Sequence, residues 1–128
     1  MKAILIVGLP GSGKTTHGKQ IAKRENCLFV DDINVRTLPL VEENKGTVVI
    51  ADVWFCEEKT RTRAVKMLNE MGYDDIEWLF FENNPDQCRK NVAKRADGRS
   101  VTGLIQGLTG KYTIPKEIEP IKVYNGLE

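Results

Sequence analysis

The chain has 128 residues, of which 41% are hydrophobic, and this length and composition predict a single domain with one core. Lysine and arginine total 19 against 18 acidic residues, so the net charge of +1 excludes a general attraction to nucleic acid or membrane, and an anionic ligand must be held by local groups. The three cysteines, Cys27, Cys56 and Cys88, form no CxxC pair, which argues against a disulfide framework or zinc site and favours buried free thiols.

Short apolar segments bounded by turn residues predict five β-strands, at residues 3–7, 27–30, 47–51, 77–81 and 121–124. The amphipathic or charged segments between them predict helices at residues 14–24, 33–43, 57–71, 85–96 and 101–108, with Pro39 disturbing the second. Because continuously apolar strands alternate with helices, we predict an α/β fold in which helices cover both faces of a parallel sheet. The first strand is too short for a signal-peptide core or a transmembrane helix, so we expect a soluble, cytoplasmic protein without a membrane partner.

The segment from Gly8 to Thr15 separates the first predicted strand from the first predicted helix and has the sequence Gly-Leu-Pro-Gly-Ser-Gly-Lys-Thr. It matches the P-loop pattern G-x-x-x-x-G-K-[ST] in the strand-to-helix context that the pattern requires. Glycines let backbone N–H groups converge on phosphate oxygens, and the dipole of the following helix favours the same anion. We therefore predict a P-loop NTPase fold that binds ATP; the alternative is a glycine-rich connector with a stray lysine.

Individual residues of the P-loop have predicted tasks. Lys14 should reach the β- and γ-phosphates of ATP, and the hydroxyl of Thr15 should bind Mg²⁺, a hard cation that prefers oxygen ligands. The predicted nucleotide-binding residues are Gly8, Pro10, Gly11, Ser12, Gly13, Lys14, Thr15 and Thr16, together with Arg99 further along the chain.

Carboxylates follow two of the predicted strands: Asp31 and Asp32 end the second, and Asp52 ends the third. Ligands of open α/β sheets bind beyond the carboxyl ends of the strands, so these side chains are candidates for catalysis. Asp31 or Asp32 should orient the acceptor hydroxyl and take its proton, whereas Asp52 should hold Mg²⁺ through water or orient the acceptor. Asp31 and Asp32 could divide the two roles, and Asp32 could instead cap the helix at 33–43.

A basic run lies on and after the predicted helix that begins at Pro85. It comprises Arg89, Lys90, Lys94, Arg95 and Arg99. Arg95 and Arg99 are one helical turn apart beside the pair Asp97-Gly98, where a hinge is easy, so they could form a lid that stabilises the transferring phosphate. The alternative is a solvated helix face.

Trp54 and Phe55 follow Asp52 and are equally compatible with stacking on an acceptor base and with a place in the core.

Taken in chain order, the P-loop, Asp31-Asp32 with Arg36, Ile50-Ala51-Asp52, and residues 91–99 and 123–126 resemble the kinase part of bacteriophage polynucleotide 5'-kinases. That family lies within the wider group of P-loop nucleoside and small-molecule kinases, and the likeness spans nearly the whole chain. It implies a five-stranded parallel sheet, a short arginine-bearing lid after the fourth strand, and transfer of the γ-phosphate of ATP to a hydroxyl. It also implies a general base at Asp31 or Asp32, recognition of the acceptor phosphate by Arg36, and lid arginines at Arg95 and Arg99.

Three functions compete for this sequence. The first is an ATP-dependent kinase acting on a 5'-hydroxyl of nucleic acid or on a nucleoside-like acceptor, the second is a small-metabolite kinase, and the third is a regulatory module that hydrolyses nucleotide slowly. A GTPase switch would need an N-K-x-D element, and Asn44-Lys45 is followed by Thr47 in place of the aspartate. Catalysis is favoured because carboxylates at two strand ends accompany the paired arginines. The sequence gives no sign of the oligomeric state.

Overall fold

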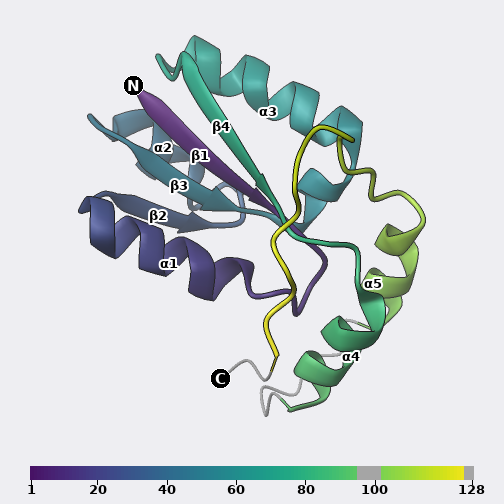
Figure 1. Cartoon of the computed structure of the whole chain (residues 1–128). Helices are drawn as coiled ribbons and strands as arrows, with labels where there is room; N and C mark the ends of the chain where they lie inside the picture. Colours follow the sequence, from purple (N-terminus) through teal and green to yellow (C-terminus); the bar gives the residue numbers. More distant parts are fainter. Residues whose placement is uncertain (95–101, 126–128) are drawn as a thin grey trace.

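The computed structural model describes residues 1–94 and 102–125, along which strands and helices alternate (Figure 1). The elements in chain order are β1 (Lys2–Val7), α1 (Lys14–Glu25), β2 (Leu28–Asp31), α2 (Leu38–Glu43), β3 (Val48–Ala51), the 3₁₀ helix η1 (Val53–Cys56), α3 (Glu58–Glu70), β4 (Asp75–Phe80), α4 (Pro85–Lys94) and α5 (Thr102–Thr109).

The strands form a parallel sheet in the order β2-β3-β1-β4. β1 is central, since Ile4 pairs with Val49 of β3 on one side and with Glu77 of β4 on the other. Leu5 of β1 packs in one hydrophobic cluster with Leu68 of α3. The next residue of β1 faces the opposite side of the sheet and packs with Ile21 of α1. The predicted α/β fold, with helices on both faces of a parallel sheet, is confirmed, and α1 and α3 lie on opposite sides of the sheet in Figure 1.

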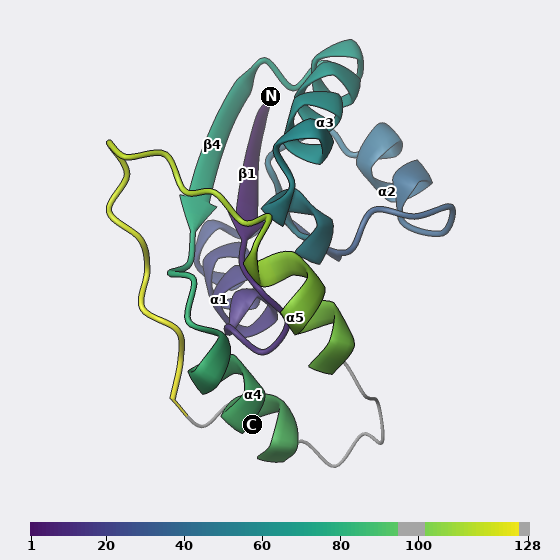
Figure 2. The same ribbon diagram turned by 90° about the vertical axis from the view of Figure 1, so that its right-hand side faces the viewer.

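The predicted fifth strand, at residues 121–124, is wrong: the described residues form a sheet of four strands. Ile121 makes a single parallel bridge with Phe81, in which the Ile121 N–H donates to the Phe80 carbonyl at 2.8 Å. The Ile121 carbonyl in turn accepts from the Glu82 N–H at 2.7 Å, so this one residue makes both bonds of the bridge. Beyond it the chain runs to the P-loop, where the Tyr124 N–H donates to the Ser12 carbonyl at 3.0 Å. We call residues 121–125 the strap; in Figures 1 and 2 it is the yellow segment that runs down past the end of β4.

The second predicted helix starts later than expected, at Leu38, because side chains organise residues 32–37 as a turn. The Asn34 side-chain oxygen accepts hydrogen bonds from the N–H groups of Arg36 at 2.9 Å and Thr37 at 3.1 Å. The Thr37 hydroxyl donates to the Asp32 carbonyl at 2.7 Å. Such local bonds compete with helical ones. Asp32 is therefore not a helix cap, and its φ of 64° places it in the left-handed region, which aspartate tolerates. Pro39 lies in the first turn of α2, where its missing N–H costs nothing.

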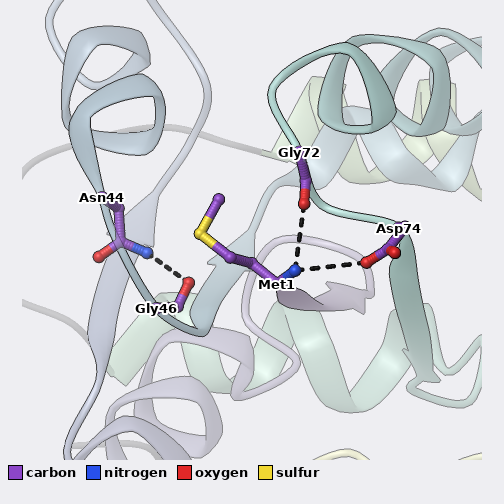
Figure 3. Close-up of polar contacts among 5 residues, drawn as sticks. All are labelled: Met1, Asn44, Gly46, Gly72 and Asp74. Carbon is purple, nitrogen blue, oxygen red and sulfur yellow. Dashed lines mark hydrogen bonds and ion pairs between the residues drawn. The ribbon is translucent and has the colours of Figure 1, made fainter.

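Polar contacts also organise the amino-terminal end of the sheet, opposite the P-loop (Figure 3). The ammonium of Met1 donates to the Gly72 carbonyl at 3.1 Å and to Asp74 at 3.3 Å. The Asn44 amide donates to the Gly46 carbonyl at 2.8 Å. These bonds fix the turns that enter β3 and β4. No helix in the described ranges is long and apolar enough to cross a membrane.

Replacing Tyr73 by phenylalanine should lower the free energy of unfolding by about 1 to 3 kcal/mol, because buried carbonyls that lose a donor are costly. Tyr73 is fully buried, and its hydroxyl donates to the Val41 carbonyl at 2.8 Å while accepting from Asn44 at 3.0 Å. Urea denaturation of the two proteins measures the difference. Equal unfolding free energies would contradict this role, and nucleotide affinity serves as the control because Tyr73 lies far from the P-loop.

Candidate functional site

The P-loop connects β1 to α1 and follows a path that only glycine permits at two points. Gly11 has a φ of 85° and Gly13 a φ of 109°, both in the left-handed region. A Cβ on Gly13 would also lie 2.7 Å from the ring of Tyr124. The first turn of α1 contains no acidic residue, so its exposed N–H groups and positive dipole end can favour an anion. The predicted glycine-rich turn between strand and helix is therefore present with its geometry intact.

A buried hydroxyl in this loop fits a phosphate ligand. Ser12 is fully buried, and its Oγ has no hydrogen-bond partner among the residues that the structure describes. Buried polar groups in proteins nearly always have a partner, so an unsatisfied hydroxyl calls for an explanation. A phosphate oxygen could accept the bond, which makes the loop chemically suited to the nucleotide that the sequence predicts.

Lys14 folds back onto the loop that carries it. Its ammonium donates to the Leu9 carbonyl at 3.1 Å, and the residue is only 7% exposed. Burial lowers the pKa of Lys14, and the nearby Cys56, Asp31 and Asp32 groups oppose that shift. Asp31 ends β2 and Asp32 follows it, so the negative charges at this strand end act on the Lys14 ammonium.

A hydrogen bond from the Thr15 hydroxyl to Oδ2 of Asp31, at 3.3 Å, links the P-loop to the end of β2. Hydroxyl and carboxylate oxygens are suitable ligands for Mg²⁺, which usually takes only one or two groups from the protein and completes its shell with water and phosphate. The donor set therefore fits the predicted ion. No group of three His, Cys, Asp or Glu side chains that could hold a metal is found in the part of the chain that the structure describes.

Asp52 is 5% exposed, and its carboxylate bonds to both the turn after β2 and the start of η1. Its Oδ2 accepts from the Ile33 N–H at 3.0 Å, and its Oδ1 accepts from the Trp54 N–H at 2.9 Å. The carboxylate thus fixes the turn after β2 against the start of η1. Its predicted contact with Mg²⁺ or the acceptor stays a prediction.

The two aromatic residues after Asp52 have different environments. Phe55 is 1% exposed and packs edge-on against Trp78, with ring centroids 5.4 Å apart, so it belongs to the core. Trp54 is 49% exposed. Arg36, also exposed, sits in the turn that Asp52 anchors. Trp54 is therefore accessible for stacking on an acceptor base, one of the two roles that the sequence allowed, whereas the buried Phe55 is not.

The sequence analysis did not identify Tyr124 of the strap as a residue that packs against the P-loop. The ring of Tyr124 lies against Gly13, and its hydroxyl is 2.9 Å from Nδ1 of His17 on α1. Burial lowers the pKa of His17. The only signal in the sequence was the resemblance at residues 123–126, which assigned Tyr124 no role.

The basic run is only partly described. Arg89, Lys90 and Lys94 are exposed on α4, and Arg89 pairs with Asp86 at 3.1 Å. Arg95 and Arg99 lie outside the described residues, as do Asp97 and Gly98, so the lid and its arginines stay predictions.

All three cysteines are free, as predicted, although Cys27 is only partly buried. Burial raises the pKa of Cys56 to about 12, so its thiol is not a nucleophile at neutral pH.

Comparison with known proteins gives one relative in sequence. The uncharacterized protein R277 of Acanthamoeba polyphaga mimivirus is 31% identical over 119 residues, which cover 87% of this chain and 86% of that protein. No known protein-family model matches the chain.

Several solved structures share the fold. A gluconokinase from Sinorhizobium meliloti 1021 superposes with a TM-score of 0.64 at 15% identity, covering 94% of this chain and 81% of that chain. A sugar kinase from Janibacter sp. HTCC2649 gives a TM-score of 0.61 at 13% identity, covering 96% and 83%. The protein APE1195 gives 0.58 at 18% identity, covering 97% and 84%. The chain therefore has the α/β fold of these two kinases.

Proposed function

The chain belongs to the same family as the mimivirus protein R277, and we propose that it is an ATP-dependent phosphotransferase that moves the γ-phosphate of ATP to a hydroxyl acceptor. The observation that carries the proposal is the hydrogen bond between Thr15 and Asp31, at 3.3 Å. It joins the phosphate-binding loop to the carboxylates after β2, so the phosphate side and the acceptor side of the site meet there. Mg²⁺ and ATP, when bound, would supply an activated phosphoryl group whose negative charge the metal offsets.

The residues of the P-loop would bind and orient the phosphates. The backbone N–H groups at the start of α1 and the Ser12 hydroxyl donate hydrogen bonds to phosphate oxygens. Lys14 exchanges its bond to the Leu9 carbonyl for a phosphate oxygen, and its buried position strengthens the interaction because little water competes.

Asp31 and Asp32 would divide two tasks. Asp31, already bonded to Thr15, would hold Mg²⁺ together with that hydroxyl. Asp32 would orient the acceptor hydroxyl and take its proton, and its φ of 64° begins the loop of residues 32–37. Asp52 positions that loop through Ile33 and Trp54, and any contribution it makes to the metal passes through water.

For the acceptor we favour a nucleoside-like compound or the 5'-hydroxyl of a polynucleotide. Trp54 is a half-exposed aromatic side chain beside the carboxylates, which suits stacking on a base. Arg36, in the neighbouring turn, suits an acceptor phosphate. The resemblance to phage polynucleotide 5'-kinases supports the same class.

A small sugar or sugar acid is the second candidate, because two of the structures that share the fold are a gluconokinase and a sugar kinase. Slow nucleotide hydrolysis by a regulatory module is the third reading. We also propose that residues 1–128 form one P-loop kinase domain; the cytoplasmic location stays a prediction.

A transfer assay with γ-labelled ATP and Mg²⁺ tests the proposal across 5'-hydroxyl DNA, 5'-hydroxyl RNA, nucleosides, nucleoside monophosphates and gluconate. Label should move to a base-bearing acceptor. Transfer to gluconate alone would select the second candidate. Release of inorganic phosphate without transfer to any acceptor would contradict the kinase proposal.

Replacing Trp54 by alanine should raise the KM for a base-bearing acceptor by about fivefold to a hundredfold, since stacking on one base contributes roughly 1 to 3 kcal/mol. The KM for ATP should not change, because Trp54 lies on the acceptor side. Leu40→Ala is the matched control, since Leu40 is also 49% exposed but lies on α2. Equal acceptor KM values for the wild type and Trp54→Ala would reject stacking at this position.

A further inference from the structure

A buried amide on α4 holds together three segments that are far apart in the chain. Asn91 is fully buried, and its Nδ2 donates to the Gly11 carbonyl of the P-loop at 2.8 Å and to the Tyr124 carbonyl of the strap at 2.6 Å. Its Oδ1 accepts from Gln87 at 3.0 Å. A primary amide has two N–H donors, and Asn91 uses them on two backbone carbonyls.

The strap makes its own bond to the P-loop next to this amide. The Tyr124 N–H donates to the Ser12 carbonyl at 3.0 Å. Two successive carbonyls of the P-loop, those of Gly11 and Ser12, therefore point outward, the first to Asn91 and the second to Tyr124.

This arrangement sets the direction of the N–H groups in the loop. In a planar trans peptide, the carbonyl of one residue and the N–H of the next point in opposite directions. Holding the Ser12 carbonyl against the strap therefore aims the Gly13 N–H away from the strap. The Gly11 carbonyl is held in the same way, and the N–H of Ser12 points to the Leu9 carbonyl, at 3.1 Å, inside the loop.

The P-loop also packs closely against the two segments that Asn91 joins, α4 and the strap. A Cβ on Gly11 would lie 2.7 Å from the Cys88 carbonyl of α4, and one on Gly13 would lie 2.7 Å from the Tyr124 ring. The P-loop is thus wedged between α4 and the strap, and Asn91 bonds to both the loop and the strap.

We propose that Asn91 is a positioning residue for the phosphate site: by holding Gly11 and Tyr124, it keeps the peptides of the P-loop oriented for phosphate binding. The proposal rests on the proposed function in one respect, namely that the phosphate in question is that of ATP. Asn91 is fully buried, so it would act through Gly11 and Tyr124 and not by direct contact with the nucleotide.

The first test needs no nucleotide. Hydrogen exchange is compared by mass spectrometry for the wild type, Asn91→Asp and Asn91→Ala, in peptides that cover residues 9–15 and 121–125. We expect exchange to quicken by about tenfold or more in both regions, the effect of losing a hydrogen bond of ordinary strength. Peptides from β1 and β3 should keep their protection. Unchanged exchange in the P-loop and the strap would overturn the proposal.

The second test uses the titration of the new carboxyl in Asn91→Asp. When protonated, this carboxyl can donate one of the two lost bonds, and when ionised it faces two carbonyls without a proton to donate. The ratio of the Kd for Mg·ATP of Asn91→Asp to that of the wild type should therefore rise by about tenfold between about pH 5.5 and pH 8.5, which brackets a carboxyl pKa raised by burial. Asn69→Asp is the matched control, since Asn69 is an exposed helical asparagine on α3, and its ratio should stay flat.

The outcomes separate this inference from the proposed function. A flat ratio for Asn91→Asp, with ATP bound normally, would reject the positioning role and leave the kinase proposal standing. A wild type that binds no ATP would reject the proposed function, and the exchange experiment would still decide whether Asn91 orders the P-loop. Asn91→Ala serves that experiment if the aspartate variant does not fold.

Discussion

Replacing Lys14 by methionine is expected to lower the turnover of phosphoryl transfer by about a thousandfold or more, a loss of roughly 4 kcal/mol of transition-state stabilisation. The ammonium is the one cation of the P-loop, and it is 7% exposed, so its attraction to phosphate is weakly screened. Methionine keeps an unbranched stem in the same space, which makes it a better test than alanine of the charge alone. Steady-state turnover at saturating Mg·ATP measures the effect.

The variant should still fold. It loses the hydrogen bond to the Leu9 carbonyl, which is destabilising, but it no longer buries a charged ammonium, which is stabilising. Thermal unfolding checks this directly. Lys19→Met is the matched control, since Lys19 is exposed on the same helix, α1, and its turnover should stay near that of the wild type. A folded Lys14→Met protein with normal turnover would refute the P-loop assignment.

Replacing Asp32 by asparagine is expected to lower turnover by about a hundredfold to ten-thousandfold, the usual contribution of a general base. The affinity for ATP should change little, because the base meets the acceptor and not the nucleotide. Asparagine is a matched substitution here, since Asp32 has a φ of 64° and asparagine also tolerates that region.

Asp31→Asn should behave differently, with a marked rise in the Mg²⁺ concentration needed for half-maximal turnover, because Asp31 is bonded to the Thr15 hydroxyl. Measuring turnover against Mg²⁺ and ATP for both variants separates the two roles. If Asp32→Asn retains its turnover and Asp31→Asn loses it at every Mg²⁺ concentration, the base is Asp31. If both retain turnover, the base lies elsewhere.

The strand-to-helix order and the P-loop could be predicted from sequence because their signals are local. Apolar runs such as the one in β1 and the spacing of Gly8, Gly13 and Lys14 need no knowledge of distant residues. The late start of α2 also has a local cause, the bonds of Asn34 and Thr37, but an amphipathic pattern over residues 33–43 concealed it. The predicted fifth strand was wrong because residues 121–124 have a strand-like apolar pattern, yet Ile121 alone bridges to β4 and Tyr124 bonds to Ser12, a contact that no local pattern reveals.

In the candidate site, too, the residues that could be predicted are those with a local signal in the sequence. The P-loop residues and the carboxylates after β2 were found because a motif or a strand end marks them. Burial decided what the sequence left open, placing Phe55 in the core and Trp54 at the surface. Asn91 is a single asparagine within a basic run, and its task appears only when α4, the P-loop and the strap are packed together.

The bond between Ser12 and Tyr124 also bears on the order in which the protein assembles during synthesis. The phosphate-binding loop is translated more than a hundred residues before the backbone group that holds its outer side. Closing a loop of that length costs entropy before the contact returns any energy, so it should form late in folding. We expect a ribosome-bound chain that has not yet exposed Tyr124 to bind ATP more weakly than the released protein, which makes nucleotide affinity a marker of this long-range folding step.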